Sequence, residues 1–173
     1  SKTSGEDYLT ISFIPSTYIT IKISKQKLYL FDNSQILKVY SISTSRFGIG
    51  NKSGSYKTPL GLHRIISKIG RNAYGGAIFK KRRNIGKIFK VYKNKKKAVD
   101  LITTRILRLE GLEPGINKGK GIDSFKRCIY IHGTPEEWLI GRPASHGCIR
   151  MKNGDVIGLF DLVKRDTLVK IER

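Results

Sequence analysis

A run of alternating residues near the start of the chain restricts the possible folds most strongly. Between residues 18 and 24, Ile19, Ile21 and Ile23 face one way, and the residues between them are polar. This period of two is typical of a β-strand with one buried face. Two further strands are predicted as its antiparallel neighbours, over residues 27–31 and 36–43, joined by an Asp-Asn-Ser turn.

The rest of the chain predicts more strands and one helix. An apolar stripe at helical spacing indicates a helix over residues 156–163, which Asn153 or Asp155 can cap. We therefore expect a mainly β fold with a helix close to the C-terminus. The other strands are expected over residues 62–66, 100–109, 128–132 and 167–171.

The chain is expected to form one domain. Its 173 residues suit a single core, and we find neither an internal repeat nor a linker. Residues 1–16 are interpreted as an N-terminal extension or a remnant of trimming, and residues 17–173 as the domain. No apolar run approaches the length of a membrane span.

Positive charge is the strongest compositional feature. Lys and Arg number 34 against 13 Asp and Glu, a net charge of +21, which attracts polyanions. Residues 80–97 hold ten basic residues and no acid, and we expect a loop and short-strand insertion there. This insertion is either a solvated surface or a grip on an anionic polymer. No nucleic-acid reading motif is present.

Cys148 and His132 are the residues best suited to chemistry. Cys148 lies in a Ser-His-Gly-Cys-Ile-Arg segment, where nearby His and Arg can lower a thiol pKa and Gly147 can turn the backbone toward an oxyanion. His132 ends a predicted strand, a suitable position for a general base. Each also has a purely structural reading, as an inert buried thiol and a half-buried histidine.

Cys128 is the second cysteine, on the same predicted strand face as Tyr130 and His132. It could form a disulfide with Cys148, serve a redox role or simply pack. With no C-x-x-C or H-x-x-x-H spacing in the chain, no metal site and no cofactor are expected.

These segments together resemble the L,D-transpeptidase catalytic domain, also called the YkuD domain. The resemblance is most specific in Ile-His-Gly-Thr at 131–134, followed by Ser-His-Gly-Cys-Ile-Arg-Met at 145–151. Lys-Thr-Pro-Leu-Gly at 57–61 resembles the family's preceding Thr-Pro element, and residues 21–31 resemble its first hairpin. The resemblance implies a YkuD-like β-sandwich or mixed sheet. The basic insertion matches nothing in that pattern.

The resemblance implies a role for each matching residue. Cys148 would be the nucleophile, His132 the proton acceptor and donor, and the Gly133 carbonyl would orient the histidine. The backbone N–H groups of His146, Gly147 and Cys148 would bind the oxyanion. The residues expected to hold the substrate or wall its cleft are Ser145, Arg150, Tyr130, Trp138 and Tyr74.

The implied reaction is acyl transfer on peptidoglycan stem tetrapeptides. Cys148 would form an acyl-enzyme and release the terminal D-alanine, and a second stem amine would give a 3–3 crosslink. Attachment of an envelope protein and an L,D-carboxypeptidase reaction with water remain alternatives. A non-catalytic basic module that binds wall polymer or nucleic acid is the rival of another class. We expect an extracytoplasmic monomer with stem peptides as partners and no nucleic acid.

Overall fold

The computed structural model describes residues 15–89 and 100–173, and over these ranges the fold is mainly β, as predicted. Its helical elements are α1 (Asn153–Leu162) and two short 3-10 helices, η1 (Ile23–Lys25) and η2 (Glu137–Leu139). Its strands are β1 (Thr17–Lys22), β2 (Lys27–Asp32), β3 (Gln35–Ser43), β4 (Gly61–Ile69), β5 (Ala77–Lys80), β6 (Arg83–Ile88), β7 (Ile102–Gly111), β8 (Tyr130–Gly133), β9 (Ile149–Met151) and β10 (Leu168–Glu172).

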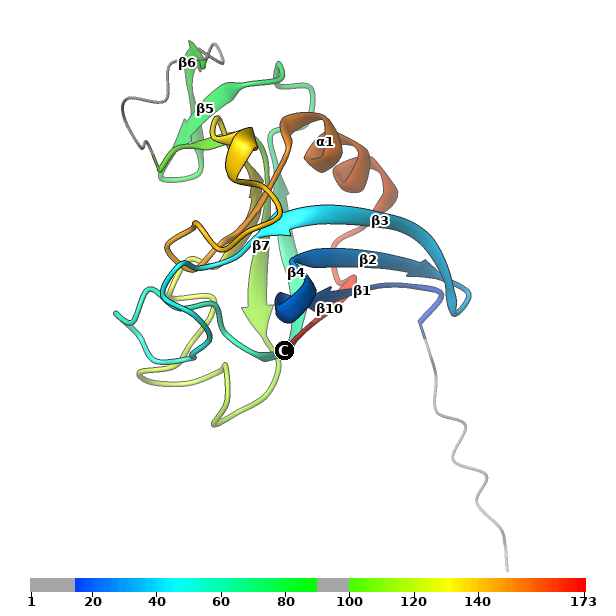
Figure 1. Ribbon diagram of the computed structural model, residues 1–173, viewed down its shortest axis with the longest axis vertical. Coiled ribbons are helices and arrows are strands. Elements are labelled where there is room, and N and C mark those ends of the chain that lie inside the picture. Colours follow the sequence, from blue (N-terminus) through cyan, green and yellow to red (C-terminus); the bar gives the residue numbers. More distant parts are fainter. Residues whose placement is uncertain (1–14, 90–99) are drawn as a thin grey trace, which may run out of the picture.

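The strands form one mixed sheet that closes on itself. The order is β4-β10-β1-β2-β3-β9-β8-β7, and a further pairing of β7 with β4 completes the ring. The β1–β10 and β8–β9 pairs are parallel, and the β1-β2-β3 meander is antiparallel as predicted. The β5–β6 hairpin branches off β7 at one end of the molecule (Figure 1). Closure leaves the ring without free strand edges.

The core lies inside this ring. Ile19 and Ile21 of β1 are fully buried, as their alternation predicts. α1 contributes Val156, Leu159 and Phe160 to the same apolar cluster and packs against β7 and β8. Each large side chain buried here contributes on the order of 1.5–3 kcal/mol to folding. The ring and α1 therefore form a rigid support for the residues on its outer face.

Local geometry corrects two sequence predictions. The helix begins at Asn153, its N-cap residue is Lys152, and neither Asn153 nor Asp155 caps it with a side chain. β8 begins only at Tyr130, because Cys128 adopts a left-handed backbone (φ 57°). Cys128 therefore does not share a strand face with His132. Residues 90–97 of the basic insertion lie outside the described residues, and its first part forms the end of β5 and all of β6.

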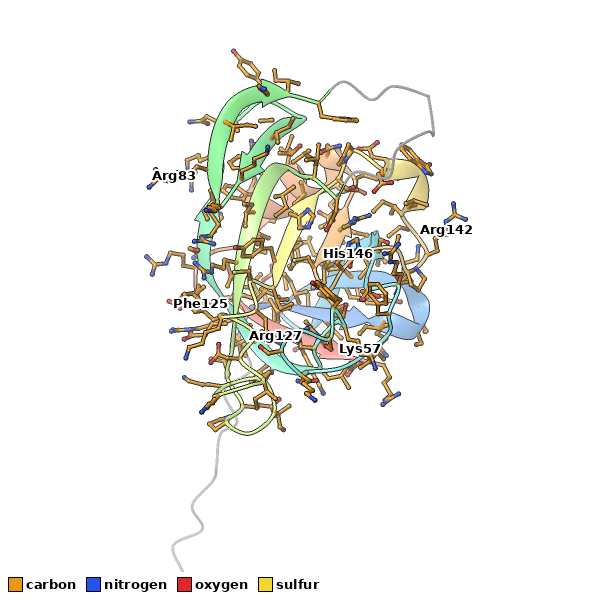
Figure 2. The ribbon with its side chains drawn as sticks, turned by 90° about the vertical axis from the view of Figure 1, so that its left-hand side faces the viewer. Lys57, Arg83, Phe125, Arg127, Arg142 and His146 are labelled. Atoms are coloured by element: carbon orange, nitrogen blue, oxygen red, sulfur yellow. The ribbon has the colours of Figure 1, made fainter. Side chains whose placement is uncertain are left out.

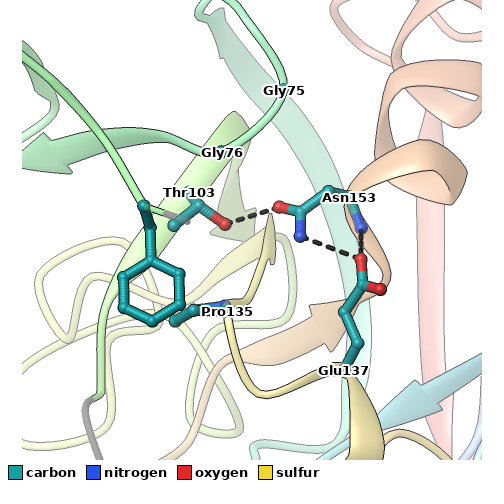
Figure 3. A pocket seen from close by; sticks show the side chains of 7 residues that line it. Gly75, Gly76, Thr103, Pro135, Glu137 and Asn153 are labelled. Carbon is teal, nitrogen blue, oxygen red and sulfur yellow. Dashed lines mark hydrogen bonds between the residues drawn. The ribbon is translucent and has the colours of Figure 1, made fainter. Parts of the chain in front are cut away.

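Asn153 uses its side chain to join three segments instead of capping. Its Oδ1 accepts hydrogen bonds from the hydroxyls of Thr103 (2.6 Å) and Thr104 (2.5 Å) on β7. Its Nδ2 donates to the Thr134 carbonyl at 2.9 Å. It also donates to Glu137 at 2.9 Å (Figure 3). The start of α1 is thereby tied to β7 and to the loop after β8. Gly75, Gly76, Phe89 and Pro135 complete a small pocket of about 230 Å³ around this junction.

Replacing Asn153 should therefore destabilise the domain. We expect Asn153→Ala to lower the free energy of unfolding by about 1–3 kcal/mol, because partners of the amide lose their hydrogen bonds. Urea denaturation measures the change, and Lys152→Ala, at an exposed neighbouring position, is the matched control. Equal midpoints for the two variants would contradict the proposed junction.

Candidate active site

The parallel pairing of β8 with β9 brings the two candidate catalytic segments together. Ile131 pairs with Ile149, and both point into the core. His132 pairs with Arg150, so these side chains lie on the outer face of the ring. Cys148 comes two residues before Arg150 and packs beside Tyr130 in a second, outer apolar cluster. Cys148 therefore directly precedes β9, two residues before the partner of His132, and its sulfur accepts the N–H of Tyr130, two residues before His132.

The Cys148 thiol is held by the backbone of the segment leading into β8. The N–H of Tyr130 donates to Sγ at 3.3 Å, and the thiol lies 3.3 Å from the carbonyl oxygen of Cys128. The residue is half-buried. Burial raises the pKa of the thiol to about 12, although the Tyr130 N–H opposes this. Cys148 is therefore a neutral thiol at physiological pH, and it needs a base when it reacts.

His132 has the properties of such a base. Its side chain is almost completely buried, and Nδ1 lies 2.6 Å from the carbonyl oxygen of Gly133. A carbonyl only accepts, so Nδ1 carries the proton and Nε2 keeps its lone pair. Burial lowers the pKa of His132 to about 4, which keeps the ring neutral but also weakens it as a base until charge develops beside it. A Cβ at Gly133 would lie 2.6 Å from the Thr103 carbonyl oxygen, so only glycine fits there.

A buried arginine links both sides of the site. The guanidinium of Arg150 lies 2.6 Å from Asp100 and 3.3 Å from Glu136. Asp100 also lies 2.9 Å from Nδ1 of His146, without hydrogen-bond alignment. Burial alone would raise the pKa of Asp100, but its hydrogen bond to Arg150 and the charges of Arg150 and His146 hold that pKa below its usual value. The Arg150–Glu136 pair is buried on both sides, and removing one partner of such a pair costs about 3–5 kcal/mol.

The loop before Cys148 is fixed from within by Ser145. This buried hydroxyl donates to the Cys148 carbonyl (2.6 Å) and accepts from the Gly147 N–H (3.2 Å). Thr58 donates to the Gly147 carbonyl at 3.0 Å. Gly147 has φ +125°, a backbone conformation that favours glycine. The Gly147 N–H therefore donates to Ser145. Among the described residues, the N–H groups of His146 and Cys148 donate to no loop carbonyl or side-chain acceptor.

A cleft of about 410 Å³ opens beside His146. Its lining includes Arg150, Asp100 and the exposed Arg46. The His146 ring also packs near Phe47 and Tyr56, at centroid distances of 5.8 and 6.1 Å. Figure 2 faces the side of the molecule where His146, Arg127 and Lys57 are labelled.

The predicted substrate residues fall into different positions. Tyr130 and Arg150 lie at the site, and Ser145 is buried inside the loop that it supports. Trp138, on η2, and Tyr74, in the loop before β5, are exposed at the surface, and neither lines the cleft beside His146. The aromatic side chains that pack near the His146 ring are those of Phe47 and Tyr56, which sequence analysis did not identify.

Sequence analysis also missed several polar residues of the site. They lie in loops or turns with no recognisable local motif, and the only available signal was the isolated position of Asp100, three residues after the basic insertion. The missed residues are Arg82, Asp100, Arg127 and Glu136.

Comparison with known families agrees with this geometry. The family model of the YkuD L,D-transpeptidase catalytic domain matches residues 16–171, nearly all of the chain. The chain belongs to the YkuD family.

Two Bacillus subtilis (strain 168) proteins match parts of this YkuD domain. YkuD is 51% identical over 43 residues, which cover 25% of this chain and 26% of that protein. YqjB is 44% identical over 52 residues, which cover 30% of this chain and 28% of that protein. The matches therefore span little more than a quarter of either relative.

Solved L,D-transpeptidases share the fold of this YkuD domain at low sequence identity. L,D-transpeptidase 3 from Mycobacterium tuberculosis, in complex with a faropenem-derived adduct, has a TM-score of 0.57 and 16% identity, covering 92% of this chain and 61% of that one. An L,D-transpeptidase from Mycobacterium smegmatis has a TM-score of 0.54 and 12% identity, covering 91% and 59%. The chain thus spans about three-fifths of these solved chains.

The pKa of Cys148 predicts slow alkylation of this YkuD domain at neutral pH. In a Cys128→Ser background, we expect the iodoacetamide rate to rise about tenfold per pH unit between about pH 7 and 10, because the thiolate fraction keeps growing. It should not level off below the pKa of about 12. Intact-mass spectrometry gives the rates, with glutathione as a free-thiol control. A plateau near neutral pH would show a thiolate and contradict this account.

Two buried histidines predict a loss of stability in mild acid. Burial lowers the pKa of both His132 and His63 from 6.5 to about 4. The unfolded chain therefore binds protons first, and stability falls as the pH drops from 6.5 toward about 4, by up to about 1.4 kcal/mol per pH unit for each histidine. Urea denaturation across this window measures the slope. His63→Asn should reduce the slope of the unfolding free energy against pH by about half. An unchanged slope would contradict the lowered pKa of His63.

Proposed function

We propose that this domain is a cysteine L,D-transpeptidase that acts on peptidoglycan stem tetrapeptides. One observation carries the proposal: the β8–β9 pairing puts His132, oriented by the Gly133 carbonyl, opposite Arg150, and the Cys148 sulfur two residues earlier contacts the Tyr130 N–H of β8. A nucleophile and a base, with a third group orienting the base, form the basic unit of covalent acyl-transfer catalysis. Membership of the YkuD family supports the same reaction.

In the acylation step, Cys148 Sγ attacks the carbonyl carbon of the third-position diamino acid. His132 Nε2 takes the thiol proton as the S–C bond forms, and the oxyanion is bound by the N–H groups of His146 and Cys148. The C–N bond then breaks, and the imidazolium returns the proton to the departing amine of D-alanine. Starting from a neutral thiol and a neutral ring, charge develops only during attack, where fixed dipoles stabilise it most.

In the second step, an acceptor resolves the thioester. A stem amine gives a 3–3 crosslink, a protein amine anchors that protein, and water gives an L,D-carboxypeptidase. The energy comes from the broken peptide bond, so the reaction suits an extracytoplasmic enzyme without access to ATP. The catalytic unit is a monomer formed by residues 17–173, and it uses no cofactor. No helix within residues 15–89 or 100–173 is long and apolar enough to cross a membrane.

Product analysis tests this function. Incubation with a disaccharide-tetrapeptide should give a dimer that lacks one D-alanine, and Cys148→Ala should abolish it because no other nucleophile replaces the thiol. His132→Asn should lower the rate by about 10²–10⁴-fold. Mass spectrometry identifies the products, and a trimmed tripeptide monomer would indicate the carboxypeptidase.

His63→Asn is the matched control for the base. His63 is also buried with a lowered pKa, but it bonds to Ser124 and to the Gly61 carbonyl. The activity of His63→Asn should stay within about threefold of wild type, since surface and structural changes away from the site alter kcat little. Near-native activity of Cys148→Ala, or equal losses in both histidine variants, would refute the assignment.

A further inference from the structure

The turn between β5 and β6 has an unusual backbone. Lys80 pairs with Arg83, so the hairpin turns on two residues only, Lys81 and Arg82. Both have left-handed backbones, with φ 45° and 64°. Two-residue turns of this kind favour Asn-Gly, because other side chains cost energy in this conformation. Strain retained at one turn is a reason to ask what its side chains do.

Arg82 differs from the other cations of this hairpin because it turns inward. Its side chain is half-buried, and Nη1 donates to the phenol oxygen of Tyr130 at 3.0 Å and lies 4.0 Å from Sγ of Cys128. Figure 2 labels the neighbouring Arg83 at the outer edge of the hairpin. The hairpin's other basic residues are exposed, namely Lys80, Lys81, Arg83 and Lys87.

The two residues that Arg82 contacts are the two that hold the candidate nucleophile. Tyr130 donates its N–H to the Cys148 sulfur, and the Cys128 carbonyl lies against the same thiol. The guanidinium therefore contacts the side-chain ends of the two residues whose backbone groups contact the Cys148 thiol. Arg82 does not line the cleft at His146.

Arg82 carries a positive charge without a matching carboxylate. Of its five N–H donors, the Tyr130 phenol takes one, and no acidic side chain within residues 15–89 and 100–173 forms an ion pair with it. The sequence has no Asp or Glu between Asp32 and Asp100, so the hairpin cannot supply one. A guanidinium with free donors and a phenol that fixes one of its nitrogens can bind a carboxylate through two parallel hydrogen bonds.

We propose that Arg82 is a specificity residue that binds a carboxylate of the acyl donor beside Cys148. This inference rests on the proposed function and adds a substrate requirement to it. A stem tetrapeptide offers two such groups, the terminal carboxylate of the leaving D-alanine and the side-chain carboxylate of the diamino acid. Both would give the donor a negative charge on the β8 side of the thiol.

Paired donor peptides test the proposal and separate the two sources. One pair differs only in a C-terminal carboxylate or carboxamide, and the other only in a free or amidated diamino-acid side chain. In the pair that carries the recognised group, Arg82→Gln should lower kcat/KM for the carboxylate donor by about tenfold to a hundredfold, the worth of a charge-assisted hydrogen bond. The same variant should change kcat/KM for the amide donor by less than about threefold.

Arg83→Gln is the matched control, because it removes the same charge one residue along but from an exposed side chain. This variant should change kcat/KM by less than about twofold for each of the four donor peptides. Equal losses for the acid and amide donors in Arg82→Gln would overturn the proposal, and so would no loss for any donor. Equal losses from both arginine variants would reduce the effect to general electrostatic attraction.

Binding to an inactive protein separates this inference from the proposed reaction. Calorimetry with the same donors on Cys148→Ala, with and without Arg82→Gln, measures carboxylate recognition without turnover. Carboxylate-dependent binding that Arg82→Gln removes, together with no turnover by the wild type, would refute the reaction and leave the recognition intact. Turnover by the wild type with no acid-amide difference in binding would refute the role of Arg82 alone.

Discussion

The parallel pairing of β8 with β9 is the constraint on which the rest of the site depends. Its register puts isoleucines in the core and His132 and Arg150 on the outer face, and Cys148 directly precedes the paired residues. A slip of one residue would turn these side chains into the apolar core. The closed ring of strands and α1 make that register costly to change, because the same two strands carry core residues on their other face. Core packing therefore fixes the relative positions of the candidate nucleophile and base.

The site combines neutral reacting groups with a buried arginine whose charge is paired. Burial keeps both the Cys148 thiol and the His132 ring neutral, so no thiolate forms before a substrate is present. Arg150 is compensated by Asp100 and Glu136, which lets a buried cation stand next to the base without leaving an unpaired charge. The site thus rests uncharged at its reacting atoms and cationic around them, an environment suited to anionic donors.

The sequence predicted those features that depend on local pattern. Alternation located the β1-β2-β3 meander, and the pattern before the His-Gly segment located β8, whereas the short strand β9 after Ser-His-Gly-Cys was not predicted. Features made by distant contacts were missed: Asn153 looked like a helix cap but bonds to β7, and Asp100 and Arg82 reach the site from a loop and a turn with no motif. Cys128 was placed wrongly because a left-handed residue cannot be read from alternation. The hydrogen bond from the Gly147 N–H to the Ser145 hydroxyl likewise could not be predicted from the sequence.

The central claim is that Cys148 is the nucleophile, and covalent trapping tests it most directly. The protein would be incubated with faropenem, the compound behind the adduct in a structural neighbour, and digested for tandem mass spectrometry. We expect one adduct, on the peptide that contains Cys148, which is lost in Cys148→Ala and retained in Cys128→Ser. An adduct on Cys128 alone, or an unmodified protein after prolonged exposure, would contradict the account.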